Sequence, residues 1–183
     1  MKLIELKNAK KKYLNKYFNL KIREKDKILI TGINGSGKST LIKLITKYIK
    51  PDKGEVIYYK SIKINYLEEI ISLPLNIKVI DYIRQIEKIK KASFNYHLFQ
   101  ILTFPLNKNI FELSKGNKQK LALYITLFNQ SNIYILDEPL NGLDNKTQKL
   151  LINYLNNLNE TIVIVTHYKN DYIDFINKEI KLW

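Results

Sequence analysis

The sequence contains no cysteine, and this absence excludes disulfide bonds and cysteine-ligated zinc. No apolar run approaches the length that a helix needs to cross a bilayer. The first six residues are too polar for a secretory signal peptide. We therefore expect a protein of the reducing cytoplasm that reaches a membrane only through a partner chain.

Acidic residues are few, since 17 Asp and Glu stand against 31 Lys and Arg, and the formal net charge is +14. Such an excess can attract nucleic acid or an anionic membrane leaflet. It can also reflect a composition that is rich in Lys, Asn, Ile and Tyr throughout. We favour the second interpretation, because the lysines are spread along the chain and no zinc-finger spacing or RNP-type aromatic motif is present.

Glycine is scarce, yet three of the six glycines fall within residues 32–37. The phosphate-binding pattern G-x-x-x-x-G-K-[ST] is matched by Gly32-Ile33-Asn34-Gly35-Ser36-Gly37-Lys38-Ser39-Thr40, here called the P-loop. An apolar run precedes the P-loop and helically spaced apolar residues follow it, which is the strand–loop–helix context that the motif requires. Glycines let backbone N–H groups turn inward around an anion, and a helix N-terminus favours negative charge. Lys38 can reach the β- and γ-phosphates of a nucleoside triphosphate, and the Ser39 hydroxyl can bind Mg²⁺.

The hydrophobic pattern along the 183 residues predicts a single α/β domain with a mixed sheet. Alternating or β-branched runs predict strands over residues 3–6, 18–22, 28–31, 55–59, 61–67, 132–136 and 161–166. Helical spacing predicts helices over residues 39–49, 81–92, 94–102, 114–128 and 144–158. The runs at 55–59 and 61–67 are expected to pair, the first strands to form an antiparallel β edge, and residues 168–183 to hold a helix and a last edge strand.

Two adjacent carboxylates, Asp137 and Glu138, follow the apolar strand predicted over residues 132–136. Parallel α/β sheets bind their ligands at this end of a strand. Asp137 can hold Mg²⁺, directly or through water, and Glu138 can polarise the attacking water as a general base. Alone, such a pair is also compatible with a helix cap or a surface turn. Together with the P-loop it indicates nucleotide hydrolysis.

A third motif, residues 113–120, reads Leu-Ser-Lys-Gly-Asn-Lys-Gln-Lys. It resembles the signature of ATP-binding cassette (ABC) ATPases, which is usually Leu-Ser-Gly-Gly-Gln followed by basic and polar residues. Residues 133–139 resemble the Walker B motif of that family, residues 141–144 resemble its D-loop, and His167 matches its switch histidine. Tyr13 is the best match for the aromatic residue that stacks on the nucleobase. The resemblance covers residues 3–182, nearly the whole chain.

The resemblance implies a P-loop NTPase core of the ABC-ATPase type, one domain over residues 1–183 with a reduced helical subdomain at approximately 70–128. It also implies that two cassettes, expected to be identical, pair head to tail around two ATP molecules, with the P-loop of one facing the signature of the other. Ser114 and the N–H groups near Gly116 would then cap the γ-phosphate. His167 would stabilise the charge that develops on this phosphate, while Lys38 and Glu138 would complete the catalytic set.

The chain departs from the family pattern in three places. Lys115 and Asn117 replace the usual Gly and Gln of the signature. Glu69 best matches the glutamine of the Q-loop, where a carboxylate can bind Mg²⁺ but adds negative charge beside the phosphates. The interval between Lys38 and Ser114 is short for the family, so the helical subdomain, which normally receives the membrane partner, has to be reduced.

Apolar residues remain numerous in residues 69–111, notably Tyr82, Phe94, Leu98 and Phe99. They either receive a membrane partner or form an ordinary core, and the first interpretation is favoured. The single histidine in this segment, His97, is expected to be packed or solvated rather than a ligand.

The resemblance therefore predicts an ATP- and Mg²⁺-dependent ATPase subunit that powers a membrane transporter from the cytoplasmic face of the cell membrane. The transmembrane permease would be a separate chain. The signature looks most like those of bacterial exporters, some of which move antimicrobial peptides. The alternative is a soluble ABC-type ATPase acting on nucleic acid or ribosomes, which only the net charge supports, and a nucleic-acid partner is not expected.

Overall fold

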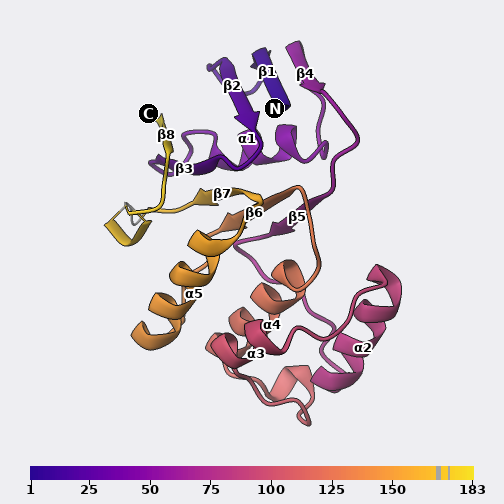
Figure 1. Ribbon diagram of the computed structural model, residues 1–183. Coiled ribbons are helices and arrows are strands. Elements are labelled where there is room, and N and C mark those ends of the chain that lie inside the picture. Colours follow the sequence, from indigo (N-terminus) through magenta and orange to yellow (C-terminus); the bar gives the residue numbers. More distant parts are fainter. Residues whose placement is uncertain (168–169, 173) are drawn as a thin grey trace. The chain divides into compact units, whose positions relative to one another are not determined.

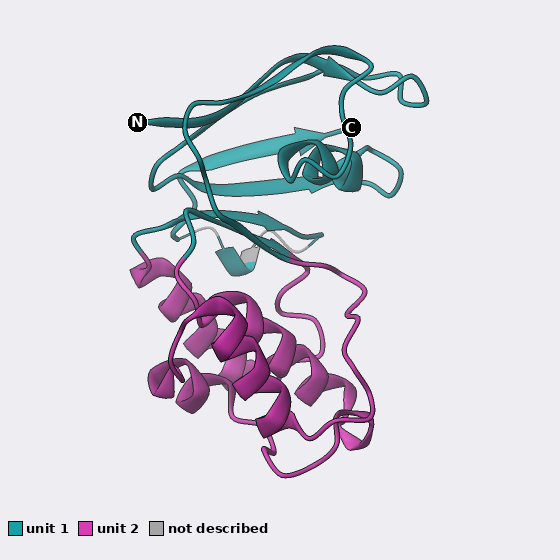
Figure 2. Cartoon of the chain, turned by 90° about the vertical axis from the view of Figure 1, so that its right-hand side faces the viewer, with its two compact units in different colours: residues 1–66, 131–136, 159–183 teal, residues 67–130, 137–158 magenta. Residues whose placement is uncertain are grey.

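The computed structural model describes residues 1–167, 170–172 and 174–183, and the chain forms two compact units (Figures 1 and 2). The β unit contains residues 1–66, 131–136 and 159–183, and the helical unit contains residues 67–130 and 137–158. The expected single domain over residues 1–183 stays a prediction. The helical unit includes residues 137–158 in addition to the predicted helical subdomain at approximately 70–128.

The described residues of the β unit form two sheets. Their strands are β1 (Lys2–Lys10), β2 (Phe18–Arg23), β3 (Lys27–Gly32), β4 (Lys53–Tyr58), β5 (Ile64–Leu67), β6 (Ile133–Asp137), β7 (Thr161–Val165) and β8 (Lys178–Leu182). One sheet has the antiparallel order β2-β1-β4, and the other has the order β5-β6-β7-β3-β8. The predicted α/β fold with an antiparallel β edge is confirmed. The predicted pairing of residues 55–59 with 61–67 is wrong, because β4 pairs with β1 while β5 belongs to the other sheet.

The five-stranded sheet brings two of the predicted site segments to one edge. Strand β3 is parallel to both β7 and β8, and Ile30 of β3 is in register with Val165 of β7. The P-loop leaves the end of β3, and His167 lies two residues beyond β7. Every residue of β7 is buried, as its continuous β-branched run predicts. Strand β8 is the predicted last edge strand. The described part of the predicted tail helix is a short 3₁₀ helix, η2 (Asn170–Tyr172), and residues 168, 169 and 173 lie outside the described residues.

Helix α1 (Lys38–Ile45) follows the P-loop and fills the space between the two sheets (Figure 1). Its buried leucines and isoleucines belong to one hydrophobic core with residues of both sheets. The helix is shorter than the predicted range 39–49, because Lys47 adopts a left-handed φ of 64° and the chain turns away. Tyr48 is consequently 72% exposed instead of facing the core.

The helical unit contains α2 (Val79–Lys90), α3 (Tyr96–Leu102), η1 (Ile110–Glu112), α4 (Lys115–Leu127) and α5 (Asn145–Asn157). Its core is aromatic, since the rings of Phe94, Phe99 and Phe104 lie 5.4 to 6.5 Å from that of Tyr124. Phe94 and Phe99 are half-buried and pack against this ring, so they contribute to an ordinary core, and their contact with a partner stays a prediction. Leu150 of α5, expected to face inward, is 40% exposed. No helix in the described ranges is long and apolar enough to cross a membrane.

Candidate functional site

The three glycines of the P-loop serve different purposes. A side chain at Gly32 would place its Cβ 2.1 Å from the carbonyl oxygen of Leu182, and one at Gly37 would meet Leu14 at 2.7 Å. Gly35 has a φ of +79°, but a Cβ added to it would have no atom within 4 Å, so this glycine borders open space. Packing against β8 thus requires glycine at position 32, the φ of +98° favours glycine at position 37, and Gly35 leaves room on the outside of the loop.

The P-loop also contains polar groups that can bind an anion. The Lys38 ammonium donates to the carbonyl oxygens of Gly32, at 2.7 Å, and Ile33, at 3.1 Å. It has three donors, so one remains for an anion. The bond from Leu41 N to Gly37 O starts the backbone ladder of α1, and the N–H groups of the preceding first turn are the ones that a helix leaves for a ligand.

The Ser36 hydroxyl is buried and has no hydrogen-bond partner among the described residues. A buried polar atom without a partner is costly unless a ligand or water completes it. The backbone amides, the spare Lys38 donor, the open space beside Gly35 and the unpaired Ser36 hydroxyl together fit a phosphate chain. Ser39 is exposed in the first turn of α1, where its hydroxyl is open to a Mg²⁺ ion bound to that chain.

The segment between β1 and β2 contacts the P-loop through Lys16 and Tyr13. Lys16 donates to the carbonyl oxygen of Ser36, at 3.3 Å, and to that of Trp183. Tyr13, in the same segment, has its hydroxyl 3.5 Å from the Thr40 hydroxyl of α1, and the residue is 69% exposed. The predicted nucleobase-stacking residue therefore stands beside the first turn of α1 with its ring open to solvent. Asn34 is exposed at the tip of the P-loop.

The signature segment starts helix α4 and lies against the D-loop within the helical unit. Ser114 is the N-cap of α4, and its Oγ accepts a hydrogen bond from Asn117 N at 3.2 Å. A Cβ on Gly116 would lie 2.7 Å from the carbonyl oxygen of Gly142, so only glycine fits this approach. The predicted start of a helix at Ser114 is confirmed.

Asp144, the last residue of the D-loop, contacts both α4 and α5. It is the predicted N-cap of α5, and it accepts a hydrogen bond from Thr147 N at 2.9 Å. Lys120 of α4 lies 3.3 Å from the same carboxylate. The Thr147 backbone N–H and hydroxyl, with Lys120 as a smaller cause, hold the pKa of Asp144 well below its usual range. The signature helix and α5 are thus joined through a single charged side chain.

The loop that carries the predicted general base has an unusual backbone. Asp137 is the last residue of β6, and both it and Glu138 are buried. Glu138 has a φ of 47°, a left-handed conformation that residues with a side chain rarely adopt. Its carbonyl oxygen accepts a bond from Asn141 N at 3.2 Å and another from the Gln119 side chain at 3.4 Å.

Sequence reasoning does not single out Gln119. A signal for it exists, because Gln119 stands four and eight residues before Leu123 and Leu127, which are buried on the same face of α4. A polar residue on a buried helical stripe has to find hydrogen-bond partners. Gln119 finds them in the loop after β6.

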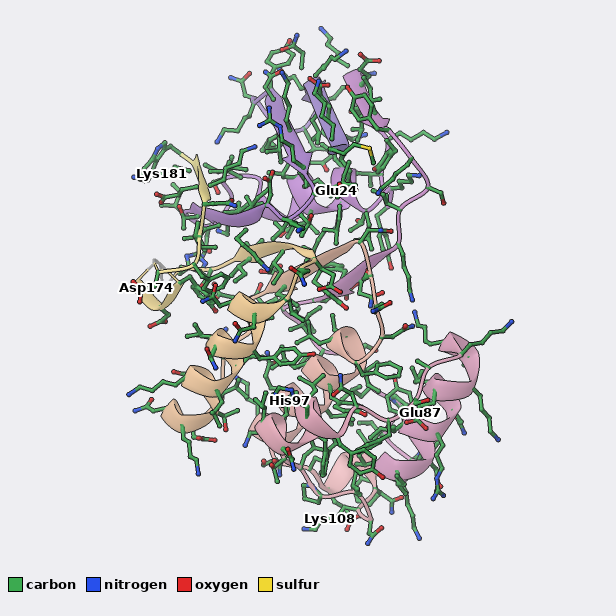
Figure 3. The ribbon with its side chains drawn as sticks, in the orientation of Figure 1. Glu24, Glu87, His97, Lys108, Asp174 and Lys181 are labelled. Atoms are coloured by element: carbon green, nitrogen blue, oxygen red, sulfur yellow. The ribbon has the colours of Figure 1, made fainter. Side chains whose placement is uncertain are left out.

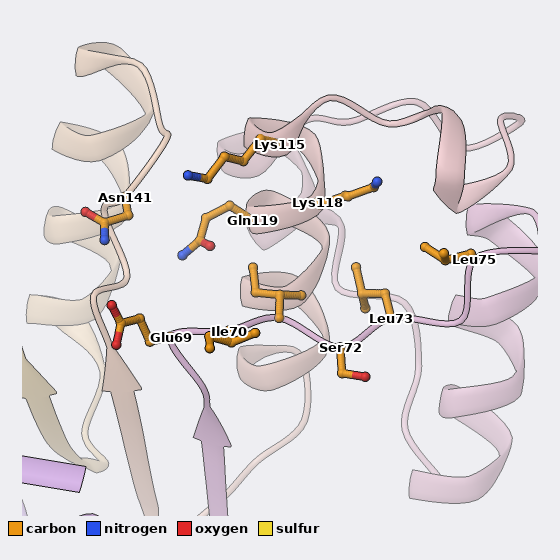
Figure 4. Close-up of a pocket in the computed structure, with 10 residues that line it drawn as sticks. Glu69, Ile70, Ser72, Leu73, Leu75, Lys115, Lys118, Gln119 and Asn141 are labelled. Carbon is orange, nitrogen blue, oxygen red and sulfur yellow. The ribbon is translucent and has the colours of Figure 1, made fainter.

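Glu69 lines a cavity of about 590 Å³ in the helical unit (Figure 4). The other lining residues are Ile70, Ile71, Ser72, Leu73, Leu75, Lys115, Lys118, Gln119 and Asn141. Figure 4 shows Lys115 and Gln119 extending from α4 toward the loop that carries Asn141. Ile70 and Leu75 are 83% and 52% exposed, so the cavity lining offers apolar surface beside the exposed Glu69, Ser72 and Lys115.

The site residues predicted from the sequence thus fall into two groups. The β unit holds the P-loop, Tyr13 and the exposed His167, while the helical unit holds Glu69, Ser114, Gly116 and Glu138. His97 is exposed, with its ring edge-on to Tyr154 at 5.7 Å (Figure 3). In the described ranges, no group of three or more His, Cys, Asp or Glu residues is placed to hold a metal ion.

Comparison with known proteins decides the family, since residues 15–141 match the family model described as ABC transporter. The chain belongs to the ABC transporter family. The predicted resemblance to this family is confirmed. The dimeric structure of the ATP-binding cassette MJ0796, bound to ADP and Pi, is 25% identical with a TM-score of 0.84, over 98% of this chain and 94% of that one.

Two relatives indicate where this ABC chain stands within the family. It is 36% identical to the ATP-binding protein Uup of Buchnera aphidicola subsp. Schizaphis graminum, over 81% of this chain and 26% of the relative. It is 32% identical to the zinc import ATP-binding protein ZnuC of Psychrobacter arcticus, over 91% of this chain and 74% of the relative. The chain thus spans about a quarter of the first relative and three quarters of the second. Neither of these two names is that of an exporter.

The glycine geometry generates a prediction that separates packing from ligand binding. Gly32→Ala should lower the melting temperature strongly, because its methyl group meets the Leu182 carbonyl. Gly35→Ala should cost only about 1–2 kcal/mol of backbone strain, yet it should weaken ATP binding by tenfold or more, since its methyl group enters the open space. Thermal unfolding and titration with a fluorescent ATP analogue measure the two effects. Wild-type ATP affinity in Gly35→Ala would contradict the assignment of that space to phosphate.

Proposed function

We propose that the chain binds ATP and Mg²⁺ at the P-loop and hydrolyses ATP between two cassettes arranged head to tail. The observation that carries the proposal is the division of the site residues. The P-loop lies in the β unit, whereas Ser114 and Gly116 of the signature lie in the helical unit. The likeness to the dimeric MJ0796 cassette supports a site completed by a second chain.

Within one chain, the P-loop residues would hold the nucleotide. The N–H groups at the start of α1 and the Lys38 ammonium bind the phosphates, and Tyr13 stacks on the base. Ser39 and Asp137 are the proposed Mg²⁺ ligands, with Glu69 as a candidate third. Bound Mg²⁺ would neutralise the charge of the phosphates.

The second chain would close the site with its signature. The Ser114 hydroxyl accepts a bond from Asn117, and its own hydrogen remains available for a phosphate oxygen. The start of α4 near Gly116 adds backbone donors and a partial positive charge. Glu138 of the first chain acts as general base on the attacking water, and His167 stabilises the charge on the γ-phosphate.

We further propose that this ATPase powers a membrane transporter from the cytoplasmic face. The cavity beside Glu69 is the proposed docking site of a separate permease, because Ile70 and Leu75 present apolar surface around a hollow. The likeness to ZnuC favours metal import over the peptide export predicted from the signature.

A soluble ATPase acting on nucleic acid or ribosomes is the second candidate. The net charge of +14 favours it, and the likeness to Uup is compatible with it, since that relative's name specifies ATP binding alone. The docking surface decides between the two candidates, because a permease would require the exposed Ile70 and Leu75 and a polyanion would not.

ATP-driven pairing can be trapped by Glu138→Gln, which keeps the shape of the side chain but loses the base. This variant should elute as a dimer with ATP and Mg²⁺, and its turnover should fall by about 10²-fold or more. Light scattering and phosphate release are the measurements, and Glu138→Gln combined with Lys38→Ala should stay monomeric. A Glu138→Gln chain that hydrolyses ATP at the wild-type rate would overturn the assignment of the base.

Docking can be tested by sedimentation with membranes from the cells that make this chain. Ile70→Asp should reduce co-sedimentation about fivefold or more, the effect expected for a contact that contributes over 1 kcal/mol. Ile89→Asp is the matched control, because Ile89 is 72% exposed on α2 outside the cavity and should behave like wild type. If both variants sediment like wild type, the docking surface is wrong, and if the chain sediments with ribosomes instead, the second candidate is favoured.

A further inference from the structure

Gln119 lies where α4 meets the loop that follows β6. The residue is 7% exposed, and its Nε2 lies 3.2 Å from the carbonyl oxygen of Pro139 and 3.4 Å from that of Glu138. A side-chain amide has two N–H donors, one for each of these carbonyls. Figure 4 shows the side chain reaching from α4 toward this loop. The amide therefore holds the backbone on the C-terminal side of Glu138.

The backbone at Glu138 needs such support. Its φ of 47° is left-handed, and Pro139 restricts the residue before it further. Conformations of this kind persist only where neighbouring groups fix them. The Glu138 carbonyl has two lone pairs, and Gln119 and Asn141 N occupy them.

A second glutamine holds the other half of the loop. Gln148 of α5 donates to the carbonyl oxygens of Leu140, at 3.2 Å, and Leu143, at 3.1 Å. The two side chains thus divide the loop carbonyls between them. Of these two glutamines, only Gln119 donates a hydrogen bond to Glu138, the candidate general base.

We propose that Gln119 is a positioning residue, which fixes the backbone of Glu138 so that its carboxylate is aimed at the attacking water. The proposal rests on the role of Glu138 as general base. A methionine or leucine at this position of α4 would continue the buried stripe of Leu123 and Leu127. An amide there is costly unless its hydrogen bonds are made, and both of its donors are committed to this loop.

Removal of both donors is the first test. Gln119→Met keeps a similar length without any N–H group, and it should lower kcat by about 10- to 100-fold through misplacement of the base. The affinity for ATP should stay close to the wild-type value, because Gln119 lies outside the P-loop. Thr126→Val is the matched control, since it removes a buried hydroxyl that donates to Ala122 O at 2.8 Å within the same helix. It should lower the melting temperature but not kcat.

The pH dependence of Gln119→Glu is the second test, and it remains decisive if Gln119→Met does not fold. The ionised carboxylate has no donor and faces two carbonyl oxygens, whereas the protonated form donates one hydrogen bond. The kcat of Gln119→Glu relative to wild type should therefore rise as the pH is lowered toward the pKa of that carboxyl. A constant ratio across the pH range would contradict the proposal.

Different results would contradict the proposed ATPase function and the role of Gln119. A wild-type chain without ATPase activity would overturn the proposed function. A wild-type chain that hydrolyses ATP, with a Gln119→Met variant whose kcat equals that of Thr126→Val, would overturn the role of Gln119 alone.

Discussion

The structure depends on holding two backbone loops in conformations that ordinary residues avoid. Gly35 and Gly37 have positive φ angles in the P-loop, and Glu138 has one at the end of β6. A glycine takes such a conformation without a Cβ clash, whereas a glutamate needs bonds from its surroundings. The P-loop is held by close packing against Leu14 and the Leu182 carbonyl. The loop at Glu138 is held by hydrogen bonds from Gln119 and Gln148, directly and through the residues that follow.

The two loops belong to different units of the chain. The P-loop and His167 lie at one end of the five-stranded sheet in the β unit, beyond the ends of β3 and β7. The signature and Glu138 share hydrogen bonds and close backbone contacts within the helical unit. A movement of α4 would therefore carry Glu138 with it. Pairing of two chains then brings a complete set of groups to each nucleotide, as we propose.

Local features of the structure could be predicted from the sequence, because their causes lie within a few residues. The P-loop, the N-cap of α4 at Ser114 and the N-cap of α5 at Asp144 are of this kind. Features that depend on distant partners could not. β4 and β5 are neighbours in the chain but join different sheets, and the half-buried Phe94 and Phe99 pack against the ring of the distant Tyr124. The sequence places Gln119 on a buried stripe, but its hydrogen-bond partners could not be predicted because they follow it by some twenty positions.

Mixing two inactive variants tests the composite site most directly. Lys38→Ala disables the P-loop of its chain, and Ser114→Arg blocks the signature of its chain, so each variant alone should lack ATPase activity. A mixed dimer contains one site built from the intact P-loop of one chain and the intact signature of the other. The equimolar mixture should regain activity, up to about a quarter of the wild-type rate, because half of the dimers are mixed and each has one intact site. A mixture as inactive as its components, or a Ser114→Arg chain with wild-type activity, would contradict a site shared between two chains.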